Sequence, residues 1–509
     1  MPCIRSPPTA SLSGIVSHTP LRAHARPDRR RLCGLSASAV PDIANDAGVD
    51  IVAPKKVSMV SLGCPKNTVD GEVMLGDLFR SGFEIVNDHE DADAIVVNTC
   101  SFVEEAKTES LEAIMQAAQL KADGKAQRVI VTGCLAQRYS EDLAEQLPEA
   151  DMVMGFQNYS SLPRHLKGML GLFPELDPDT YSQQSRTQVG EATVSFRPEY
   201  DRHRLTPRHT AYLRVAEGCN HACTFCAIPG FRGKFRSKPW QQLLDEAKYL
   251  VESGVKELNL IAEDTNQYGQ DRKDGKGLAQ LMSELGKLDG LQWMRILYAY
   301  PSYFTEDLID EIATNPKVCK YIDIPLQHIN NMTLLSMNRP PQEHTVKLLQ
   351  KLRQRIPDLV LRTTFISGFP GETEESHQEL VQFCKTFPFQ RMGAFTYSEE
   401  DGTPAAEYRD QVPQDVREAR RDELVSLQQD VGQDFAESLI GCQIPVLVDS
   451  ITDDGQFLGR TQWDAPDVDP MVFLSEPESN ELPALAVGQM RLCEVDGTLL
   501  FDIEAHPVR

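Results

Sequence analysis

Three cysteines with the spacing CxxxCxxC are the strongest chemical signal in the sequence. Cys219, Cys223 and Cys226 follow a strand-like run that ends at Glu217. A 4Fe-4S cluster normally takes four thiolates, and since no fourth cysteine lies nearby, one iron would stay open. S-adenosylmethionine (SAM) can chelate such an iron, and electron transfer to its sulfonium gives methionine and a 5′-deoxyadenosyl radical. The loop therefore predicts radical SAM chemistry, with these three cysteines at the catalytic centre.

A zinc site is the alternative for the same loop. His221 lies inside it and would supply a nitrogen ligand, with a fourth ligand from a distant position. Structural zinc sites usually use paired CxxC-type knuckles, which this loop does not have. The spacing therefore favours the cluster.

A second set of cysteines follows three other predicted strands. Cys64, Cys100 and Cys134 each come directly after an apolar, β-branched run. Because the carboxyl ends of parallel strands meet at one edge of a sheet, we expect the three thiols to lie together and to hold a second cluster with one open iron. The alternative is three unrelated buried thiols, since cysteine is a common core residue. The three runs cover residues 57–62, 94–98 and 129–132.

Alternating strand-like and helical patterns predict two parallel α/β units that position these cysteines. The first unit covers residues 55–170, and the stretch 171–205 has the aperiodic composition of a linker. The second unit, residues 206–436, offers six strand–helix repeats. Six are too few for a closed eight-stranded barrel, so we expect a partial barrel with its active site at the carboxyl ends of the strands. The predicted strands of this unit are 211–215, 257–261, 294–298, 321–324, 361–366 and 391–395, and the clearest predicted helices of the two units are 73–81, 103–119, 241–253 and 346–354.

The last part of the chain, residues 437–509, has a different pattern. Short strands alternate with turns rich in Asp, Gly and Pro, which predicts a small β-barrel. The strands expected here are 444–449, 457–461, 471–474, 490–495 and 499–503.

Charge and hydropathy limit the possible partners. The chain has 509 residues and a net charge of −24, and an acidic protein repels phosphate backbones, which argues against a simple nucleic-acid binder. The alternative is that the acidity only confers solubility. Apolar runs are strand-length, well short of the ~18 residues that a membrane span needs, so no membrane association is expected.

The first 54 residues do not resemble a folded domain. Residues 1–41 contain six arginines and six serines, with Asp28 as the only acid. This composition is typical of an organelle transit peptide; a disordered bacterial extension or a misassigned start is the alternative. A transit peptide would direct the protein to the stroma or matrix of an organelle, and the chloroplast is favoured over the mitochondrion. Without a transit peptide, the protein is expected in the cytoplasm.

The contexts of the two cysteine sets resemble the methylthiotransferase family of radical enzymes. The segments that carry the resemblance are Ser61–Asn67, Asn98–Cys100, Gly133–Cys134 and Glu217–Cys226. The resemblance implies an N-terminal cluster domain, a radical SAM core and a C-terminal TRAM module, with two 4Fe-4S clusters and SAM as cofactors. It also implies an electron donor such as flavodoxin or ferredoxin.

Within the family, three segments are similar to the branch that modifies an aspartate of ribosomal protein S-twelve: Cys64–Asp70, Leu297–Pro301, and Gly459–Thr461 with Asp464–Asp467. This branch implies two molecules of SAM, one giving a methyl group to sulfur on the first cluster and one cleaved at the second. The radical then takes hydrogen from the β-carbon of the aspartate, which captures the methylthio group.

The charge of the last domain separates this branch from a tRNA adenosine methylthiotransferase, the alternative within the family. Residues 442–509 contain three arginines, no lysine and thirteen acids. A module that binds tRNA should be basic, whereas an acidic one favours a basic partner such as a ribosomal protein or the small ribosomal subunit. A non-catalytic iron–sulfur electron carrier is the alternative outside the family, and it has no need for two clusters that each lack a fourth thiolate.

Several residues at the ends of predicted strands are candidates to bind SAM. Glu263 and Asp264 follow one strand and are expected to hold the methionyl amine, and Gln327 follows another. Ser367 and Gly368 follow a third, where glycine permits a close approach of backbone to ligand. Each has an alternative role as a loop-shaping or core residue. The arginines between positions 232 and 236 are either a site for anions or a partner, or a solvated basic patch.

Overall fold

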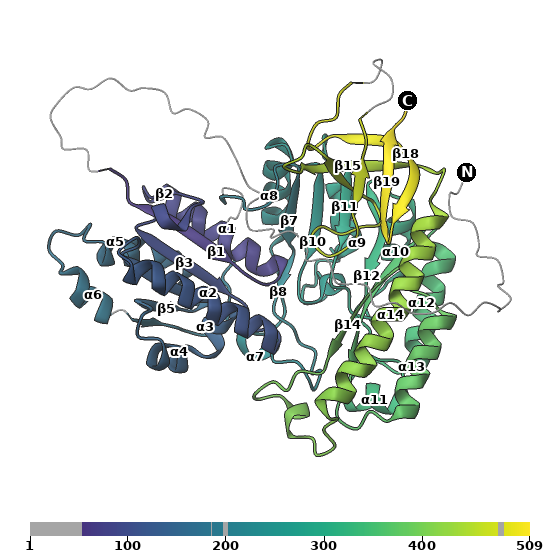
Figure 1. The fold of residues 1–509 in the computed structure, drawn as a ribbon, viewed down its shortest axis with the longest axis horizontal. Coiled ribbons are helices and arrows are strands. Elements are labelled where there is room, and N and C mark those ends of the chain that lie inside the picture. Colours follow the sequence, from purple (N-terminus) through teal and green to yellow (C-terminus); the bar gives the residue numbers. More distant parts are fainter. Residues whose placement is uncertain (1–52, 185, 197–201, 477–482) are drawn as a thin grey trace.

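A computed structural model of the chain describes residues 53–184, 186–196, 202–476 and 483–509 (Figure 1). Of the predicted transit segment 1–54, all but the last two residues lie outside this description. Two parallel α/β units are followed by a small closed β-barrel, so the predicted fold class is confirmed. Among the described residues, we find no helix with the length and apolar character that crossing a membrane requires.

The first unit is built on a six-stranded sheet in which neighbouring strands run parallel, in the order β2-β1-β3-β4-β5-β6. Its centre, β3 and β4, is almost wholly buried and rich in Val and Ile, as expected for strands covered on both faces. The strands are β1 Lys56–Ser61, β2 Glu84–Ile85, β3 Ala94–Thr99, β4 Arg128–Gly133, β5 Met152–Met154 and β6 Thr187–Gln188. The helices are α1 Pro65–Arg80, η2 His89–Asp91, α2 Glu104–Ala122, α3 Cys134–Arg138, α4 Ser140–Gln146, η3 Phe156–Ser161, α5 Leu162–Met169 and α6 Pro178–Gln184.

The stretch 171–205 is not the aperiodic linker that its composition predicted. It contains α6, and β6 pairs in parallel with β5 through Val153 and Met154, so the sheet of the first unit continues past residue 170. A helix of seven residues and a strand of two are too short for hydrophobic periodicity to reveal.

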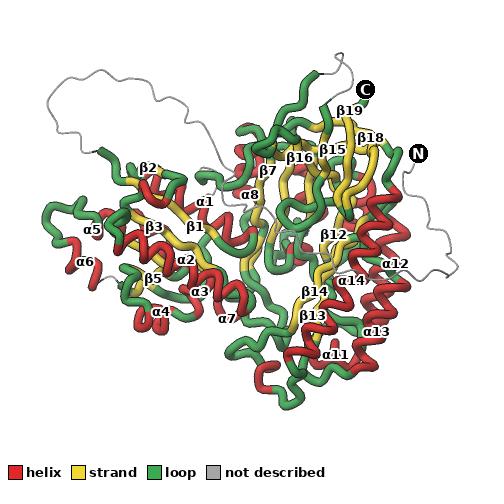
Figure 2. Tube along the Cα trace, viewed as in Figure 1, coloured by secondary structure: helices red, strands yellow, loops and turns green. Residues whose placement is uncertain are grey.

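The second unit is an open six-stranded parallel sheet with the order β14-β13-β12-β11-β10-β7, which is the expected partial barrel. Figure 2 shows the long helix α14 running beside α13 on the outer side of this second unit. The six strands are β7 Thr210–Arg214, β10 Glu257–Ile261, β11 Trp293–Ile296, β12 Val318–Asp323, β13 Val360–Ser367 and β14 Arg391–Thr396, and a separate antiparallel pair is formed by β8 Ala216–Glu217 and β9 Arg236–Ser237. The helices are α7 Ile228–Arg232, α8 Trp240–Glu252, η4 Thr265–Gln267, α9 Leu278–Leu285, α10 Glu306–Thr314, α11 Asn331–Ser336, α12 Gln342–Arg355, α13 Glu374–Thr386, η5 Pro404–Glu407 and α14 Gln414–Ser438.

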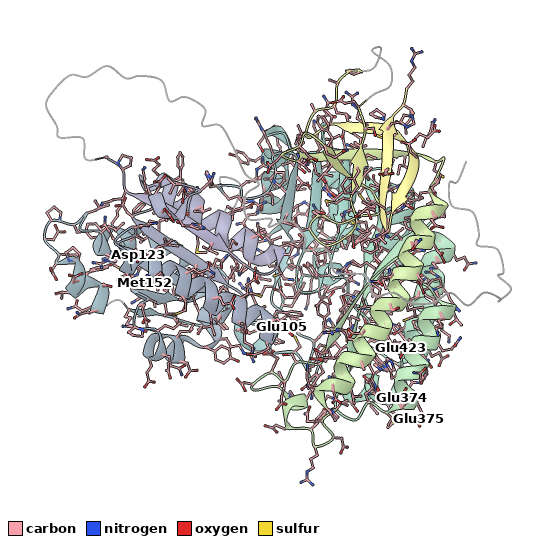
Figure 3. All side chains as sticks on the ribbon, viewed as in Figure 1. Glu105, Asp123, Met152, Glu374, Glu375 and Glu423 are labelled. Atoms are coloured by element: carbon pink, nitrogen blue, oxygen red, sulfur yellow. The ribbon has the colours of Figure 1, made fainter. Side chains whose placement is uncertain are left out.

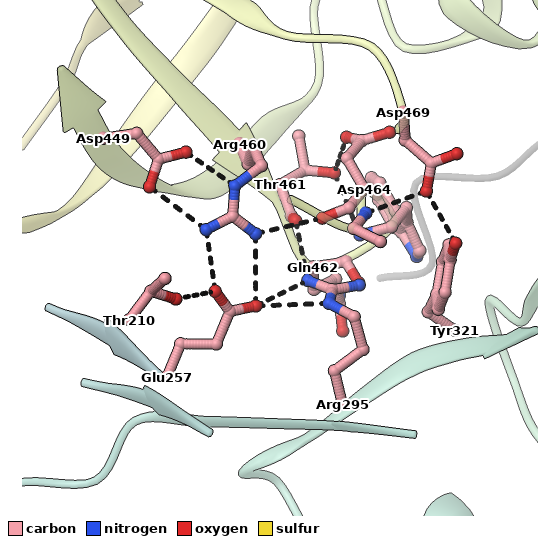
Figure 4. A network of polar contacts seen from close by, with 12 residues as sticks. Thr210, Glu257, Arg295, Tyr321, Asp449, Arg460, Thr461, Gln462, Asp464 and Asp469 are labelled. Atoms are coloured by element: carbon pink, nitrogen blue, oxygen red, sulfur yellow. Dashed lines mark hydrogen bonds and ion pairs between the residues drawn. The ribbon is translucent and has the colours of Figure 1, made fainter. Parts of the chain in front are cut away.

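The C-terminal unit is a closed five-stranded barrel with the order β15-β16-β17-β19-β18. Its strands are β15 Gln443–Ile451, β16 Phe457–Thr461, β17 Val472–Leu474, β18 Met490–Leu499 and β19 Asp502–Pro507. The barrel packs on the second unit through buried polar contacts (Figure 4). One of them joins the Tyr321 hydroxyl of β12 to Asp469 at 2.6 Å.

The two α/β units meet through ion pairs near the start of α2. Arg138 Nη1 lies 2.6 Å from Glu400 Oε2, and Lys107 Nζ lies 3.3 Å from the same oxygen. Figure 3 shows Glu105, at the start of α2, on the side of the first unit that faces the second. These contacts fix the orientation of the first cysteine set relative to the second.

Candidate iron–sulfur and SAM site

The CxxxCxxC loop lies between β8 and α7 at the edge of the second unit. Gly218 opens the loop with φ +75°, and a Cβ there would lie 2.3 Å from the Lys234 carbonyl oxygen, so only glycine fits. Burial raises the pKa of the Cys219 and Cys226 thiols to about 12, and the other thiols of the set add to both shifts. All three cysteines are free, and the charges of the other two contribute to the shift at Cys219. Bound iron would offset the cost of a buried thiolate, because a metal deprotonates the thiol that coordinates it.

His221 anchors this loop by a hydrogen bond. Its Nε2 lies 2.7 Å from Asp264 Oδ2, and its ring stacks on Tyr300 with the ring centroids 3.6 Å apart. In the described part of the chain, no three His, Cys, Asp or Glu side chains are arranged to hold a single metal ion. In a 4Fe-4S cluster each thiolate binds a different iron, so the sulfurs need not converge on one point.

Arg339 contacts the loop from the other side. Its guanidinium lies 4.1 Å from the centroid of the Tyr300 ring, and its Nη1 lies 3.8 Å from Cys223 Sγ. The loop is thus held between an Asp–His contact and an Arg–Tyr contact, both from the carboxyl-end side of the sheet.

The structure brings Cys64, Cys100 and Cys134 together at the carboxyl ends of the adjacent strands β1, β3 and β4. A Cβ at Gly63, which has φ +83°, would lie 2.7 Å from Cys100 Sγ, so the first and second cysteines approach closely. Burial raises the pKa of Cys100 to about 11 and that of Cys134 to about 12, and the charge of Cys64 adds to both. Three free thiols in one buried place provide the donor set for a second cluster.

Arg232 reaches from the second unit to this first cysteine set. It is 2% exposed, with Nη2 at 3.5 Å from Cys134 Sγ and Nη1 at 2.9 Å from Asp70 Oδ2. The solvated-patch interpretation is therefore wrong for Arg232, because α7 turns its side chain into the interface between the units. Arg236 is only partly buried and donates to the Val194 carbonyl.

Two buried, opposite charges lie between the cysteine sets without touching. Lys66 is 8% exposed, and its Nζ lies 3.7 Å from the centroid of the Tyr298 ring. Within the described part of the chain its only hydrogen bond is a long one, 3.4 Å, to the Ala262 carbonyl. Both carboxylate oxygens of Glu263 are buried and have no hydrogen-bond partner among the residues that the structure describes. Burial opposes the charge of Lys66, but the nearby Cys64 and Glu263 raise its pKa above the usual value. Glu263 also raises the pKa of the Cys226 thiol, so it faces the second set.

The remaining predicted SAM contacts lie at the ends of β12 and β13. The backbone at Gln327 bridges to Phe365, and Ser367 is buried with no partner for its Oγ. Gly368 has φ +72°, and the Cγ of Arg417 fills the space where a Cβ would lie, 2.2 Å away. Packing against α14 therefore accounts for the glycine, as in the loop-shaping alternative.

Sequence reasoning missed four side chains around the two sets: Lys66, Tyr298, Tyr300 and Arg339. Tyr298 has φ +60°, which a tyrosine rarely adopts and which no sequence pattern announces. Tyr300 and Arg339 are far along the chain from the loop that they hold. The one available signal was a lysine two positions after a cluster cysteine.

Comparisons with known proteins agree with this architecture. The model of the uncharacterized protein family UPF0004 matches residues 56–155, that of the radical SAM superfamily matches 213–384, and that of the TRAM domain matches 440–508. The chain is 42% identical over 429 residues to ribosomal protein uS12 methylthiotransferase RimO of Desulfitobacterium hafniense, covering 84% of this chain and 94% of the relative. It is 44% identical over 431 residues to the protein of that name from Geobacter sulfurreducens, with the same coverage. Among solved structures, the SAM methyltransferase TsrM of Kitasatospora setae aligns at 14% identity with a TM-score of 0.49 over 79% of each chain, a likeness too low to carry an argument.

The three domains and the two cysteine sets define a radical SAM methylthiotransferase with a TRAM module. The chain belongs to the RimO family. Enzymes of this family use two 4Fe-4S clusters and SAM, and the two sets of three free thiols described above fit those groups.

Proposed function

We propose that this chain adds a methylthio group to the β-carbon of an aspartate in small-subunit ribosomal protein uS12. The observation that carries the proposal is the pair of three-cysteine sets, one from each α/β unit, with the buried charges Lys66 and Glu263 between them. The relatives that match most of the chain carry the uS12 name. The β-carbon of an aspartyl residue has an unactivated C–H bond, and a general base has no acidic proton to remove there, so a radical route is required.

The two cysteine sets have different roles in this proposal. Cys219, Cys223 and Cys226 would hold the cluster that binds SAM, and the other set, Cys64, Cys100 and Cys134, would hold the second cluster. When bound, these groups and two molecules of SAM supply the radical and the methylthio group. The protein positions the reacting atoms and excludes water.

Five residues are proposed to form the SAM site, in different roles. Glu263 has an unpaired, buried carboxylate and would take the methionyl amine. Asp264 is bonded to His221 and would act by fixing the cluster loop. Gln327, Ser367 and Gly368 would border the ligand at the ends of the next strands. An electron donor such as flavodoxin or ferredoxin would reduce the cluster that binds SAM. If the segment 1–54 is a transit peptide, the enzyme would act in a plastid or a mitochondrion.

The charge of the outer surface supports a basic protein partner. Figure 3 shows Glu374 and Glu375 at the start of α13, next to Glu423 on α14, and all three side chains are exposed. Along α14, Arg417 and Arg420 are buried while the acids face solvent. Together with the acidic barrel, this surface attracts a basic protein and repels RNA phosphates.

The test is mass spectrometry of uS12 co-expressed with the full-length chain in a bacterial host that lacks its own enzyme. One methylthio increment on an aspartate-containing peptide, lost in Cys219→Ala and in Cys64→Ala, is the expected result. The nucleosides of tRNA from the same cells are analysed in parallel. Unmodified uS12 together with methylthio-adenosine in tRNA would overturn the proposal and favour the tRNA alternative.

A further inference from the structure

Lys66 and Glu263 are buried charges of opposite sign that do not form an ion pair. Among the described residues, no carboxylate oxygen lies within 4.0 Å of Lys66 Nζ, and neither oxygen of Glu263 accepts a hydrogen bond. Burying a charge is costly unless it is paired, and a pair that served only the fold would bring the two groups into contact. Their separation leaves each of them available to a bound group of the opposite charge.

The other buried cations near the cysteine sets already have partners. Arg232 and Arg214 both pair with Asp70 and Glu217. Arg339 donates to a backbone carbonyl and stacks on a tyrosine ring. Lys66 has three N–H donors, and with the described residues only one of them makes a hydrogen bond, which is long. Lys66 is therefore the cation best able to receive an anionic group between the two sets.

The Tyr298 ring fixes where that anion can bind. The ring lies under the ammonium at 3.7 Å, which favours the charged form and blocks one side of the nitrogen. Tyr298 is held there by its left-handed backbone, φ +60°, and by the bond from its N–H to Asp323 at 3.2 Å. The free donors of Lys66 lie on the side away from the ring.

We propose that Lys66 binds the carboxylate of the substrate's target aspartate and thereby holds its β-carbon between the two cysteine sets. This inference rests on the proposed function, because it takes the reacting group to be an aspartyl side chain. The carboxylate is one bond from the β-carbon, so it must enter the same buried space, where it needs a cation. Lys66 then selects aspartate over the isosteric asparagine, whose amide carries no charge.

The experiment compares aspartate with asparagine at one position. The holoenzyme is first reacted with recombinant uS12, and mass spectrometry locates the modified aspartate. Binding of uS12 and of its Asp→Asn variant at that position is then measured for the wild-type enzyme, Lys66→Met, Lys66→Gln and Lys66→Arg. Lys66→Gln removes the charge but keeps an N–H donor for the Ala262 carbonyl. It therefore controls for the structural effect of losing that hydrogen bond. Iron content and the electron paramagnetic resonance spectra of both clusters are recorded for every variant.

We expect the wild-type enzyme to prefer the aspartate form by about tenfold or more, as a charge-assisted hydrogen bond allows. Lys66→Met and Lys66→Gln should lose this preference with both clusters intact, and Lys66→Arg should keep most of it. An undiminished preference in both neutral variants overturns the proposal, and so does loss of a cluster in both, because Lys66 would then serve the cluster. If the wild-type enzyme does not modify uS12 at all, the proposed function fails before the variants are compared.

Discussion

Arg460 of the C-terminal barrel and Glu257 of β10 form a buried ion pair across the interface between the barrel and the radical SAM core, with Nη2 2.7 Å from Oε2 (Figure 4). Arg295 donates to the other oxygen of the same carboxylate at 3.1 Å, and Asp449 accepts from Nε and Nη2 of Arg460. One of the three arginines of the barrel is thus committed to holding the barrel in place. It cannot contribute to binding phosphates.

Arg460→Met should loosen the barrel from the core. The substitution leaves part of the Glu257 charge uncompensated in a buried place, and breaking such a buried pair costs about 3–5 kcal/mol. Hydrogen-exchange mass spectrometry should show faster exchange in peptides from β15 and β16, with β3 and β4 of the first unit unchanged. Arg491→Met, at a half-buried site of the same barrel, is the control. If the β15 and β16 peptides exchange hydrogen at the same rate in both variants, Arg460 does not hold the barrel on the core.

The same interface should respond to acid. Burial alone would raise the pKa of Glu257, but Arg460 and Arg295 outweigh it and hold the pKa well below its usual range. A carboxyl group with a depressed pKa stabilises the folded state above its unfolded pKa, about 4.3, and loses that contribution as pH falls toward the folded value. The protection of β15 in the wild type should therefore be constant from neutral pH to about 5 and fall below about 4. Glu257→Gln should lack this acid-dependent part, and Asp430→Asn, on the exposed side of α14, should keep it.

The two cysteine sets should be separable by substitution. Cys219→Ala removes a thiolate from the radical SAM loop, so SAM cleavage to 5′-deoxyadenosine should be abolished while the first set still binds its cluster. Cys64→Ala should do the reverse: 5′-deoxyadenosine should still form in the presence of a reductant, but no methylthio product. Iron per chain should fall by about half in each variant. Loss of all iron in both would mean that the clusters are not independent.

The position of the radical SAM loop should depend on its histidine anchor. His221→Phe keeps a ring to stack on Tyr300 but loses the bond to Asp264, and loss of such a supporting contact typically costs about 10–100-fold in activity or metal affinity. The rate of 5′-deoxyadenosine formation and the spectrum of the reduced cluster are the measurements. Lys273→Met, on an exposed loop, is the control. An unchanged rate and spectrum in His221→Phe would show that the backbone alone holds the loop.

Sequence patterns were sufficient for the parts of the fold that alternate in hydrophobicity. All six strands of the second sheet were predicted within a few residues, because each is a buried run with clear ends. The start of α1 was missed by eight residues: Asn67, Asp70 and Gly71 are poor helix formers, although Pro65 favours a first helical position. The two cysteine sets were found because each follows a strand end. Lys66 was not, and the sequence left Arg232 open between a binding site and a solvated patch. The burial of both residues is created by a neighbouring unit that packs on them from far along the chain.

Glu400 should couple the two α/β units. It accepts Arg138 at 2.6 Å and Lys107 at 3.3 Å, and its side chain is nearly inaccessible. Glu400→Gln removes the charge that both cations share, which should let the first cysteine set shift relative to the second. Methylthio transfer requires the substrate carbon to lie between the sets, and a displacement of one ångström can lower such a rate by about a hundredfold.

SAM cleavage at the radical loop needs no contribution from the first unit, so it should continue at the wild-type rate. The measurement is the ratio of methylthio product to 5′-deoxyadenosine, with the exposed neighbour Glu399→Gln as control. A lower ratio in Glu400→Gln alone would establish that this ion pair sets the geometry of transfer, whereas a parallel fall of both products would show that it serves only the stability of the radical SAM core.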